Sequence, residues 1–295
     1  MNLADISTVK KLLQREDFSF KKSLGQNFLV DASVCPAMAA AAADKNTGVI
    51  EIGPGIGVLT VQLCEIAKRV VAIELDERLK NILAVTLADC GNVEVVFAEA
   101  NFSFISDAMK IDLAALIKEK FADCKKVCVC ANLPYYITSP VIMHLLESRL
   151  PLDNITVMVQ DEAADRICAT VGRREAGAVT AAVDYFAQAQ KLFTVGAEGF
   201  VPPPKVKSAV IKLRIRKTPK VTPLNEEFFF KFVRACFAQR RKTLLNTVSN
   251  TLHIEKSVLR KALAEASLPE NTRGETLDMQ TLCRLADSVY REKQG

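Results

Sequence analysis

Three glycines in alternation, preceded by a carboxylate, form the first stretch of this chain that could do chemistry. The stretch Glu51-Ile-Gly-Pro-Gly-Ile-Gly57 follows a short apolar run and precedes a helical pattern that begins at Val58. A strand that turns through glycines into a helix offers free backbone N–H groups and lets a ligand approach the main chain. Glu74 follows 21 positions after Gly53, close to the spacing of about 20 at which an acidic residue reaches ribose hydroxyls. The pattern therefore predicts a cofactor that contains adenosine, held across the tips of two parallel strands.

The spacing of the glycines separates two kinds of cofactor. Dinucleotide-binding turns carry G-x-G-x-x-G, whereas here the glycines are Gly53, Gly55 and Gly57, with Glu51 before them. This pattern resembles the E-x-G-x-G-x-G loop of methyltransferases that use S-adenosylmethionine. A glycine-rich turn can also hold no ligand, but the acidic residue at the expected distance favours a cofactor site.

A second polar stretch, Asn132-Leu-Pro-Tyr135, closes a later apolar run. Pro134 stiffens the turn and biases the residue before it to an extended conformation. Such a turn can direct the side-chain carbonyl of Asn132 and the backbone carbonyl of Leu133 toward one point, with an aromatic ring beside them. A proline turn with a packed tyrosine is the alternative. The position beside the cofactor loop favours a catalytic turn.

The elements that must position these residues form a repeating pattern. Strand-like runs alternate with helical patterns at intervals of roughly 20 to 30 residues, which is typical of a parallel sheet wound from βα units. The runs are Val49–Ile52, Val70–Leu75, Val93–Phe97, Val127–Ala131 and Ile155–Val159. Ligands of such sheets lie beyond the carboxyl ends of the strands. Gly53, Glu74, Glu99 and Asn132 each follow such an end, so we expect them to share one site.

Composition limits the class of protein. The chain has 295 residues, 49% hydrophobic and 25% charged, with a formal net charge of +5, as in an ordinary soluble globular protein. The first 20 residues lack the apolar core of a signal peptide and no segment approaches a membrane span, so we expect a cytoplasmic protein. Nine cysteines, an odd number, scattered mostly in apolar runs predict buried reduced thiols. No zinc-binding spacing is present, and we expect no metal.

The C-terminal part has a different pattern. Thr218-Pro-Lys-Val-Thr-Pro223 is typical of a linker, and Asn225 is a suitable cap for a helix over Glu226–Arg241. Further helical patterns cover 254–266 and 277–291. The predicted fold is therefore α/β, a Rossmann-like sheet over residues 1–219, followed by a small all-helical domain over residues 220–295.

A basic region precedes the linker. No acidic residue occurs between Phe200 and Leu224, and the alternation in Ile211–Arg216 places Lys212, Arg214 and Arg216 on one face of a strand. A solvated edge strand and a surface that follows RNA phosphates both account for this face. Arg240, Arg241 and Lys242 at the end of the predicted helix could complement its dipole or contact RNA.

Several segments together resemble one family, the rRNA adenine N6,N6-dimethyltransferases. They occur in the family's order and cover nearly the whole chain. The segments are Ser23-Leu-Gly-Gln-Asn-Phe-Leu29, Glu51–Gly57, Ile73-Glu-Leu-Asp76, Asn132-Leu-Pro-Tyr135, Phe200-Val-Pro-Pro-Pro-Lys-Val-Lys-Ser-Ala-Val210 and Phe237-Ala-Gln-Arg-Arg-Lys242. The likeness is greatest to members that act on bacterial small-subunit (16S) rRNA. It implies a class I S-adenosylmethionine-dependent methyltransferase fold.

The resemblance assigns roles to residues. Asn27 and Leu29 would cover the cofactor, Gly53 would lie against its methionine part and Glu74 would bind the ribose. The implied cofactor-binding residues are Gln26, Asn27, Leu29, Glu51, Gly53, Gly55, Glu74, Leu75, Glu99, Ala100 and Asn132. The implied catalytic residues are Asn132, Leu133, Pro134, Tyr135 and Phe200, of which Tyr135 and Phe200 would stack on the target base. The candidate RNA-binding residues are Lys205, Lys207, Lys212, Arg214, Arg240, Arg241 and Lys242. Glu99 and Lys207 stand where the family usually has Asp.

The implied activity is dimethylation of the N6 amino groups of two adjacent adenines in the 3′-terminal hairpin of 16S rRNA, with S-adenosylmethionine as methyl donor. We expect a monomer that acts on an immature small ribosomal subunit. Three alternatives stay open: a large-subunit dimethylase of the macrolide-resistance type, an RNA-binding ribosome-assembly factor with secondary catalysis, and, more distantly, a nicotinamide-dependent oxidoreductase. Mapping of methylated nucleotides and titration with NADH would separate them.

Overall fold

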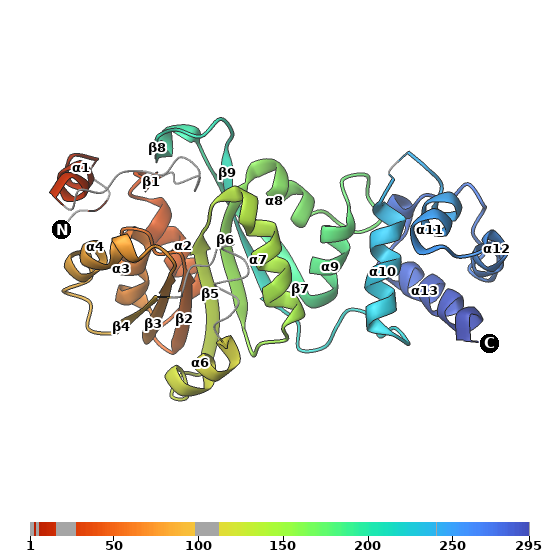
Figure 1. The fold of residues 1–295 in the computed structure, drawn as a ribbon, viewed down its shortest axis with the longest axis horizontal. Coiled ribbons are helices and arrows are strands. Elements are labelled where there is room, and N and C mark those ends of the chain that lie inside the picture. Colours follow the sequence, from red (N-terminus) through yellow and green to blue (C-terminus); the bar gives the residue numbers. More distant parts are fainter. Residues whose placement is uncertain (1–2, 4–5, 16–27, 98–111, 240, 295) are drawn as a thin grey trace. The chain divides into compact units, whose positions relative to one another are not determined.

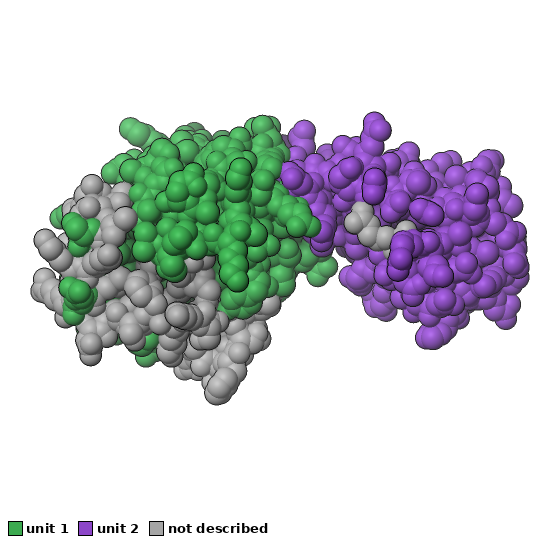
Figure 2. Space-filling view, turned by 90° about the horizontal axis from the view of Figure 1, so that it is seen from above, with its two compact units in different colours: residues 1–164, 190–215 green, residues 165–189, 216–295 purple. Residues whose placement is uncertain are grey.

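The computed structural model describes residues 3, 6–15, 28–97, 112–239 and 241–294 (Figure 1). The chain folds as two units, one made of residues 1–164 with 190–215 and the other of residues 165–189 with 216–295 (Figure 2). The boundary near residue 215 lies close to the one expected at residue 219. The segment 165–189, however, belongs with the C-terminal helices. No linker composition marks that segment, so the sequence pattern did not separate it from the sheet.

A seven-stranded sheet forms the centre of the first unit, with the strand order β4-β3-β2-β5-β6-β9-β7. Strands β4, β3, β2, β5 and β6 pair in parallel, and β9 pairs antiparallel with β6. The strands are β2 Thr47–Ile52, β3 Arg69–Glu74, β4 Val93–Phe97, β5 Lys126–Asn132, β6 Asn154–Gln160, β7 Ala187–Val195 and β9 Ser208–Ile215. The five predicted strand runs are confirmed to within two residues at each end.

Burial explains why these runs lack strict alternation. Every residue of β2 is buried, as are all but the first residue of β3 and all but the last of β6. A parallel strand that is covered on both faces must be apolar throughout. Helix α2 covers part of the sheet by packing against β5 and β6. The polar residues that remain are therefore concentrated at the strand ends.

Helices alternate with the strands along the first unit (Figure 1). They are α1 Ile6–Arg15, α2 Val34–Ala42, α3 Val58–Ile66, the 3-10 turn η2 Glu77–Leu79, α4 Lys80–Thr86, α6 Leu113–Lys120, α7 Tyr135–Glu147 and α8 Asp161–Ile167. Asp112 caps α6 by accepting the N–H of Ala115 at 2.9 Å, the local signal expected for a helix start. Each connection from a strand to the helix that follows it forms a turn at the carboxyl end of that strand.

The basic strand β9 is not an edge strand. It lies between β6 and β7, so the expectation of a solvated edge is wrong. The alternation of basic and apolar residues indicates which residues share a face of the strand, but it does not indicate which strands pair with it. Because β9 runs antiparallel to β6, Ser208 lies opposite Gln160 and Arg214 lies opposite Asn154. The start of β9 therefore lies at the carboxyl edge of the sheet and its basic end lies at the opposite edge.

A short second ribbon joins two distant segments. Strand β1 Phe28–Leu29 pairs antiparallel with β8 Phe200–Val201, which follows the 3-10 turn η3 Ala197–Gly199. Leu29 lies opposite Phe200, and the N–H of Val30 donates to the carbonyl of Gly199 at 2.8 Å. Leu29 and Phe200 expose only 4% and 3% of their surface and share a core with residues of the sheet. The ribbon therefore fixes both segments on the first unit.

The second unit is helical and has an aromatic core. Its remaining elements are α9 Ala178–Phe186, α10 Glu226–Phe237, α11 Leu244–Leu252, α12 Lys256–Glu265, the 3-10 turn η4 Gly274–Thr276 and α13 Met279–Gln294. Tyr185 of α9 lies edge-on to Phe230 of α10, with ring centroids 5.0 Å apart, and its hydroxyl donates to Glu226 at 2.8 Å. The predicted inward face of α10 is confirmed: Phe229, Phe232, Val233 and Cys236 are buried.

The capping prediction for α10 is confirmed, because Asn225 accepts the N–H of Phe228 at 2.8 Å. The predicted end of this helix is wrong. The helix ends at Phe237, and Lys242 donates its N–H to Gln239 in a turn that leads to α11. Arg241 and Lys242 therefore follow the helix instead of closing it, and Arg240 lies outside the described residues.

All nine cysteines are free thiols, as expected for reduced, largely buried side chains. Within the described part of the chain, no group of acidic, histidine and cysteine side chains has the arrangement of a metal site. No described helix is long and apolar enough to cross a membrane.

Candidate active site

The turn between β2 and α3 has an unusual backbone that explains its glycines. Gly53, Gly55 and Gly57 have φ angles of 71°, 60° and 88°, in the left-handed region where a side chain costs roughly 1–2 kcal/mol. A Cβ atom on Gly55 would meet nothing within 4 Å, whereas one on Gly57 would lie 3.1 Å from the Thr86 hydroxyl. Gly57 is thus needed for packing as well as for its φ angle. Gly55 leaves open space above the backbone, where a ligand can approach.

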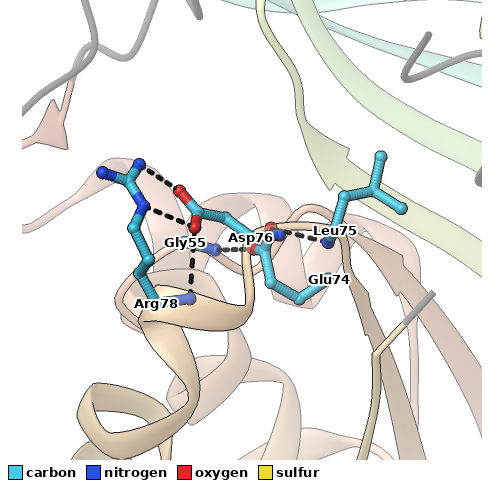
Figure 3. A network of polar contacts seen from close by, with 5 residues as sticks. All are labelled: Gly55, Glu74, Leu75, Asp76 and Arg78. Carbon is cyan, nitrogen blue, oxygen red and sulfur yellow. Dashed lines mark hydrogen bonds and ion pairs between the residues drawn. The ribbon is translucent and has the colours of Figure 1, made fainter. Parts of the chain in front are cut away.

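Glu74 at the end of β3 is held by backbone donors (Figure 3). Its Oε2 accepts the N–H of Gly55 at 3.1 Å, and its Oε1 accepts the N–H groups of Leu75 and Asp76 at 2.8 and 2.9 Å. Burial raises the pKa of this carboxyl, while the three N–H donors act to lower it. The side chain is 5% exposed. Its position at the strand tip is therefore fixed before any ligand binds.

Asp76 continues the same network. Its carboxylate accepts the Arg78 backbone N–H at 3.2 Å and the Arg78 Nε at 2.8 Å, and a second contact joins it to the guanidinium (Figure 3). The first of these bonds caps the short helix η2. Asp76 thus stabilises the turn that carries Glu74 and Leu75.

Glu51 at the end of β2 is a buried carboxyl with an unmatched oxygen. The residue is 1% exposed, and neither its Oε2 nor the Thr60 hydroxyl has a hydrogen-bond partner among the described residues. Burial raises the pKa of Glu51 to about 8, the nearby Thr60 hydroxyl lowers it, and the Glu74 carboxylate raises it further. Buried polar atoms almost always have partners, so the unmatched Oε2 of Glu51 fits a site that receives a polar or cationic ligand group.

The turn that begins at Asn132 lies next to the glycine turn. Glu51 pairs with Cys130 in the β2–β5 ladder, and continuation of that register brings Gly53 and Asn132 to neighbouring strand tips, about 5 Å apart between strands. Asn132 is half-buried, and its side chain forms no hydrogen bond to another described residue. Its amide is therefore free to bind a ligand beside the glycine turn.

The rest of this turn is rigid. Leu133 is 2% exposed, and Pro134 precedes α7 with an extended backbone, φ −54° and ψ 135°. The Pro134 carbonyl accepts the Ile137 N–H at 3.1 Å and the Thr138 hydroxyl at 3.1 Å. Tyr135 is half-buried, and its hydroxyl lies 2.6 Å from the Ser208 hydroxyl of β9. This bond was not foreseen, because the sequence offers no signal that pairs Tyr135 with Ser208.

Phe200 does not occupy the position expected of a base-stacking ring. At 3% exposure it belongs to a core cluster with Leu29, Met158 and Val210. Phe200 belongs to β8, which pairs with β1, and the sequence offers no local signal of this pairing. In this structure the ring is buried, so the stacking role of Phe200 stays a prediction that would require the ring to leave this core.

The candidate RNA-binding residues in and before β9 fall into two groups. Lys205 and Lys207 are exposed in the segment that leads into β9, at the carboxyl edge of the sheet. Lys212 donates from its Nζ to the Ala41 carbonyl at 2.5 Å, at the C-terminal end of α2. Arg214 is exposed at the opposite edge, beside the start of β6. Lys212 therefore has a partner within the first unit and Arg214 lies at the opposite edge of the sheet, and the prediction that these two residues contact RNA stays a prediction.

The remaining predicted site residues lie in the second unit or outside the described part of the chain. Arg241 and Lys242 are exposed and belong to the second unit. Gln26, Asn27, Glu99, Ala100 and Arg240 lie outside the described residues. Tyr136, which sequence reasoning did not select, follows the Asn132–Tyr135 turn directly and is 59% exposed. The doubled tyrosine in Asn132-Leu-Pro-Tyr-Tyr136 was the available signal.

Comparison with known proteins gives consistent findings. A family model described as "Ribosomal RNA adenine dimethylase" matches residues 17–286. A protein of Bacillus pumilus named "Ribosomal RNA small subunit methyltransferase A" is 46% identical over 294 residues, which cover 97% of this chain and 98% of that protein. One of the same name from Streptococcus gordonii is 44% identical and covers 99% of both chains.

Solved structures share the fold. A dimethyladenosine transferase from Plasmodium falciparum has a TM-score of 0.71 at 26% identity and covers 90% of this chain and 98% of its own. The 23S rRNA methyltransferase ErmE has a TM-score of 0.64 at 24% identity and covers 90% of this chain and all of its own. The sheet described above is thus that of a class I methyltransferase.

Proposed function

Because this chain belongs to the ribosomal RNA adenine dimethylase family, we propose that it dimethylates two adjacent adenines in the 3′-terminal hairpin of small-subunit (16S) rRNA. It is an S-adenosylmethionine-dependent rRNA methyltransferase. The names of its small-subunit relatives support the 16S rRNA as substrate. The large-subunit enzyme ErmE is related in fold alone.

The residues present fit S-adenosylmethionine. The open space over Gly55 accommodates a ligand against the main chain, and the buried Glu51 oxygen without a partner suits the cationic end of such a ligand. Glu74 has a fixed carboxylate at the tip of the neighbouring strand, where acidic residues of this type receive ribose hydroxyls. Glu51, Gly53, Gly55, Glu74 and Leu75 would together hold the cofactor. When bound, the cofactor supplies an electrophilic methyl group on a sulfonium.

The catalytic work of the chain is positioning. An exocyclic amine of adenine is a weak nucleophile because its lone pair is delocalised into the ring. Asn132 can accept one amine N–H on its side-chain carbonyl, and the Leu133 backbone carbonyl can accept the other. These two contacts would direct the lone pair out of the ring plane, and a rigid turn performs this task at little entropic cost. The bonds to the Pro134 carbonyl give the turn that rigidity.

A ring beside the amine must hold the base after it leaves its helix, as base-modifying enzymes require. Tyr135 is suited to this role because the bond to Ser208 fixes its hydroxyl while the side chain stays half-exposed. Phe200 could contribute only after leaving its core position. The observation that carries the proposed mechanism is the neighbouring position of the Asn132 turn and the glycine turn on paired strands.

We further expect a monomer that acts in the cytoplasm on an immature small subunit. The test is incubation of the protein and labelled S-adenosylmethionine with small subunits that lack the modification, followed by mapping of the methylated nucleotides. Dimethylation of two adjacent adenines near the 3′ end is the expected result. Methylation of large-subunit RNA instead, or none on either subunit, would overturn the proposal. Sedimentation of the protein alone and with each particle tests the expected monomer and the preferred particle.

A further inference from the structure

Tyr136 differs from the other tyrosines of the chain. The hydroxyls of Tyr135, Tyr185 and Tyr290 lie within hydrogen-bond distance of Ser208, Glu226 and Asn225, respectively. Tyr136 has no such bond to a described residue and exposes 59% of its surface. A tyrosine ring contributes to stability when its large apolar area is buried. Because most of Tyr136 is exposed, it contributes little stability in this way. Its ring is therefore available to a partner.

The backbone under Tyr136 is rigid. Tyr136 lies in the first turn of α7, and the Pro134 carbonyl accepts the N–H of Ile137 and the hydroxyl of Thr138. The exposed ring is therefore carried by a helix that begins directly after the catalytic turn. A flat ring on a rigid support loses little entropy when it stacks on a base.

A second exposed segment, residues 205–207, is joined to helix α7 through the contact between Tyr135 and Ser208. The Tyr135 hydroxyl lies 2.6 Å from the Ser208 hydroxyl. Tyr136 directly follows Tyr135 in the sequence, and Lys207 directly precedes Ser208. Lys205, Val206 and Lys207 are all exposed, and Val206 exposes 44% of its surface. We call the side chains of Tyr136, Lys205, Val206 and Lys207 the Tyr136 surface.

The Tyr136 surface is anchored and basic. The Lys207 carbonyl accepts the Asp161 N–H at 3.0 Å, and Ser208 is fully buried. Neither Lys205 nor Lys207 has an ion pair with a described residue, and the Asp161 carboxylate pairs with Lys191, with 2.7 Å between Oδ1 and Nζ. Two ammonium groups thus have no neutralising partner among the described residues, in a segment that the Tyr135–Ser208 contact joins to the helix that carries Tyr136.

This combination suits unpaired nucleotides. Aromatic rings stack on splayed bases, and lysines that lack internal partners bind the phosphates between them. We propose that Tyr136 stacks on the nucleotide next to the adenine being methylated, with Lys205 and Lys207 on the adjoining phosphates. Tyr136 then acts as a specificity-determining residue, because it selects which of two neighbouring adenines enters the site. The inference rests on the proposed function and names the contact for the second adenine.

The first test uses small subunits that lack the modification. Tyr136→Ala should raise the KM for subunits about 10-fold, the lower range for the loss of one base stack, and should change the ratio of methylation at the two adenines. Tyr136→Phe should keep wild-type values, because stacking needs the ring and not the hydroxyl. Cofactor binding should stay unchanged in both variants. Val85→Ala, at a residue 36% exposed on α4, is the matched control.

The second test uses the absence of tryptophan from the chain. Tyr136→Trp creates a single reporter, whose fluorescence should be quenched when a synthetic RNA hairpin with two adjacent unpaired adenines is bound to saturation, as judged by anisotropy of a labelled hairpin. Val85→Trp should show no quenching. A wild-type-like KM and adenine ratio for Tyr136→Ala, or an unquenched Tyr136→Trp in the bound complex, would overturn the proposal. Failure of the proposed function would appear separately, as absence of adjacent dimethyladenines with the wild-type protein.

Discussion

The backbone N–H of Gly55 donates to Oε2 of Glu74 at 3.1 Å, across 19 positions of the sequence (Figure 3). This bond joins the turn after β2 to the tip of β3, so one carboxylate fixes both sides of the proposed cofactor site. An ionised carboxylate has about four acceptor positions, and backbone donors use three of them. At least one position is left for a ligand hydroxyl, which is the requirement for ribose binding.

We predict that Glu74→Gln weakens cofactor binding by roughly 10- to 100-fold, because hydrogen bonds to a charged group contribute about 1.5–3 kcal/mol. The amide also brings an NH2 group against one of the three backbone donors, which lengthens the bond to Gly55 or to Leu75 and Asp76. Titration calorimetry with S-adenosylmethionine measures the change in dissociation constant. Glu65→Gln, at an exposed residue of α3, is the control. Equal affinities of Glu74→Gln and wild type would show that Glu74 only supports the fold.

Much of this site could be predicted because it depends on local sequence. The alternating glycines are required by left-handed backbone at every second residue of the turn, and apolar runs between turns are required by a sheet covered on both faces. The strand order follows from these patterns only in part. Gly53, Glu74 and Asn132 were expected at strand ends, and the carboxyl ends of β2, β3 and β5 do lie side by side.

The missed features depend on long-range pairing. Phe200 was expected to be available for stacking on the target base because nothing near it reports that β8 pairs with Leu29, 171 positions earlier. Lys212 was expected at an edge or on RNA because alternation does not reveal β7 beside β9 or the Ala41 carbonyl within reach of the ammonium. Residues 165–189 join the C-terminal helices through packing of α9 against α10, for which the sequence has no local signal.

We predict that the buried carboxyl of Glu51 makes the free energy of unfolding depend on pH. Its pKa in the folded protein is raised from 4.5 to about 8, chiefly by burial. The titratable groups that act on it or respond to it are Glu74 on β3, Cys35 on α2, Cys64 on α3 and Cys130 on β5. Neutral or anionic groups such as these cannot stabilise its charge. The folded protein therefore binds more protons than the unfolded chain between these two pKa values.

Since the folded state holds the extra proton, the free energy of unfolding of the cofactor-free protein should fall as pH rises from about 4.5 to about 8. The decrease amounts to at most a few kcal/mol, at about 1.4 kcal/mol per pKa unit. Denaturant unfolding at several pH values measures it. Glu51→Gln, which is neutral throughout, should remove this dependence and be more stable than wild type at pH 8. Parallel pH profiles for the two proteins would contradict the assignment.

We predict that removal of the Asn132 side chain lowers the rate of methyl transfer and has little effect on RNA binding. Asn132→Ala removes an acceptor that acts on the amine when methyl transfer begins, so kcat should fall on the order of 100-fold, while the KM for small subunits stays within a few-fold. Initial rates of methyl incorporation at saturating cofactor measure both parameters. Tyr135→Phe, which loses only the bond to Ser208, should retain most of the rate. A kcat for Asn132→Ala close to that of wild type would remove Asn132 from the catalytic residues.

The salt dependence of RNA binding should distinguish two kinds of lysine in and near β9. Lys205 and Lys207 have no ion-pair partner among the described residues, whereas the Lys212 ammonium donates to the Ala41 carbonyl. Each phosphate contact that is lost lowers the salt slope of RNA binding by about 0.7–0.9. Joint replacement of Lys205 and Lys207 by Gln should therefore lower the slope of log K against log salt by about 1.5, without lowering the free energy of unfolding.

The matched variant Lys212→Gln should behave in the opposite way. Its salt slope should equal that of wild type, and its free energy of unfolding should fall by about 1 kcal/mol, because a carbonyl at the end of α2 loses its donor. Filter binding of rRNA at several salt concentrations and denaturant unfolding measure the two quantities. A reduced slope for Lys212→Gln would show that RNA phosphates reach Lys212 on β9. An unchanged slope for the double variant would exclude phosphate contacts from the Tyr136 surface. The pair of variants therefore decides which part of the basic region meets the substrate and which part only holds helix α2 to the sheet.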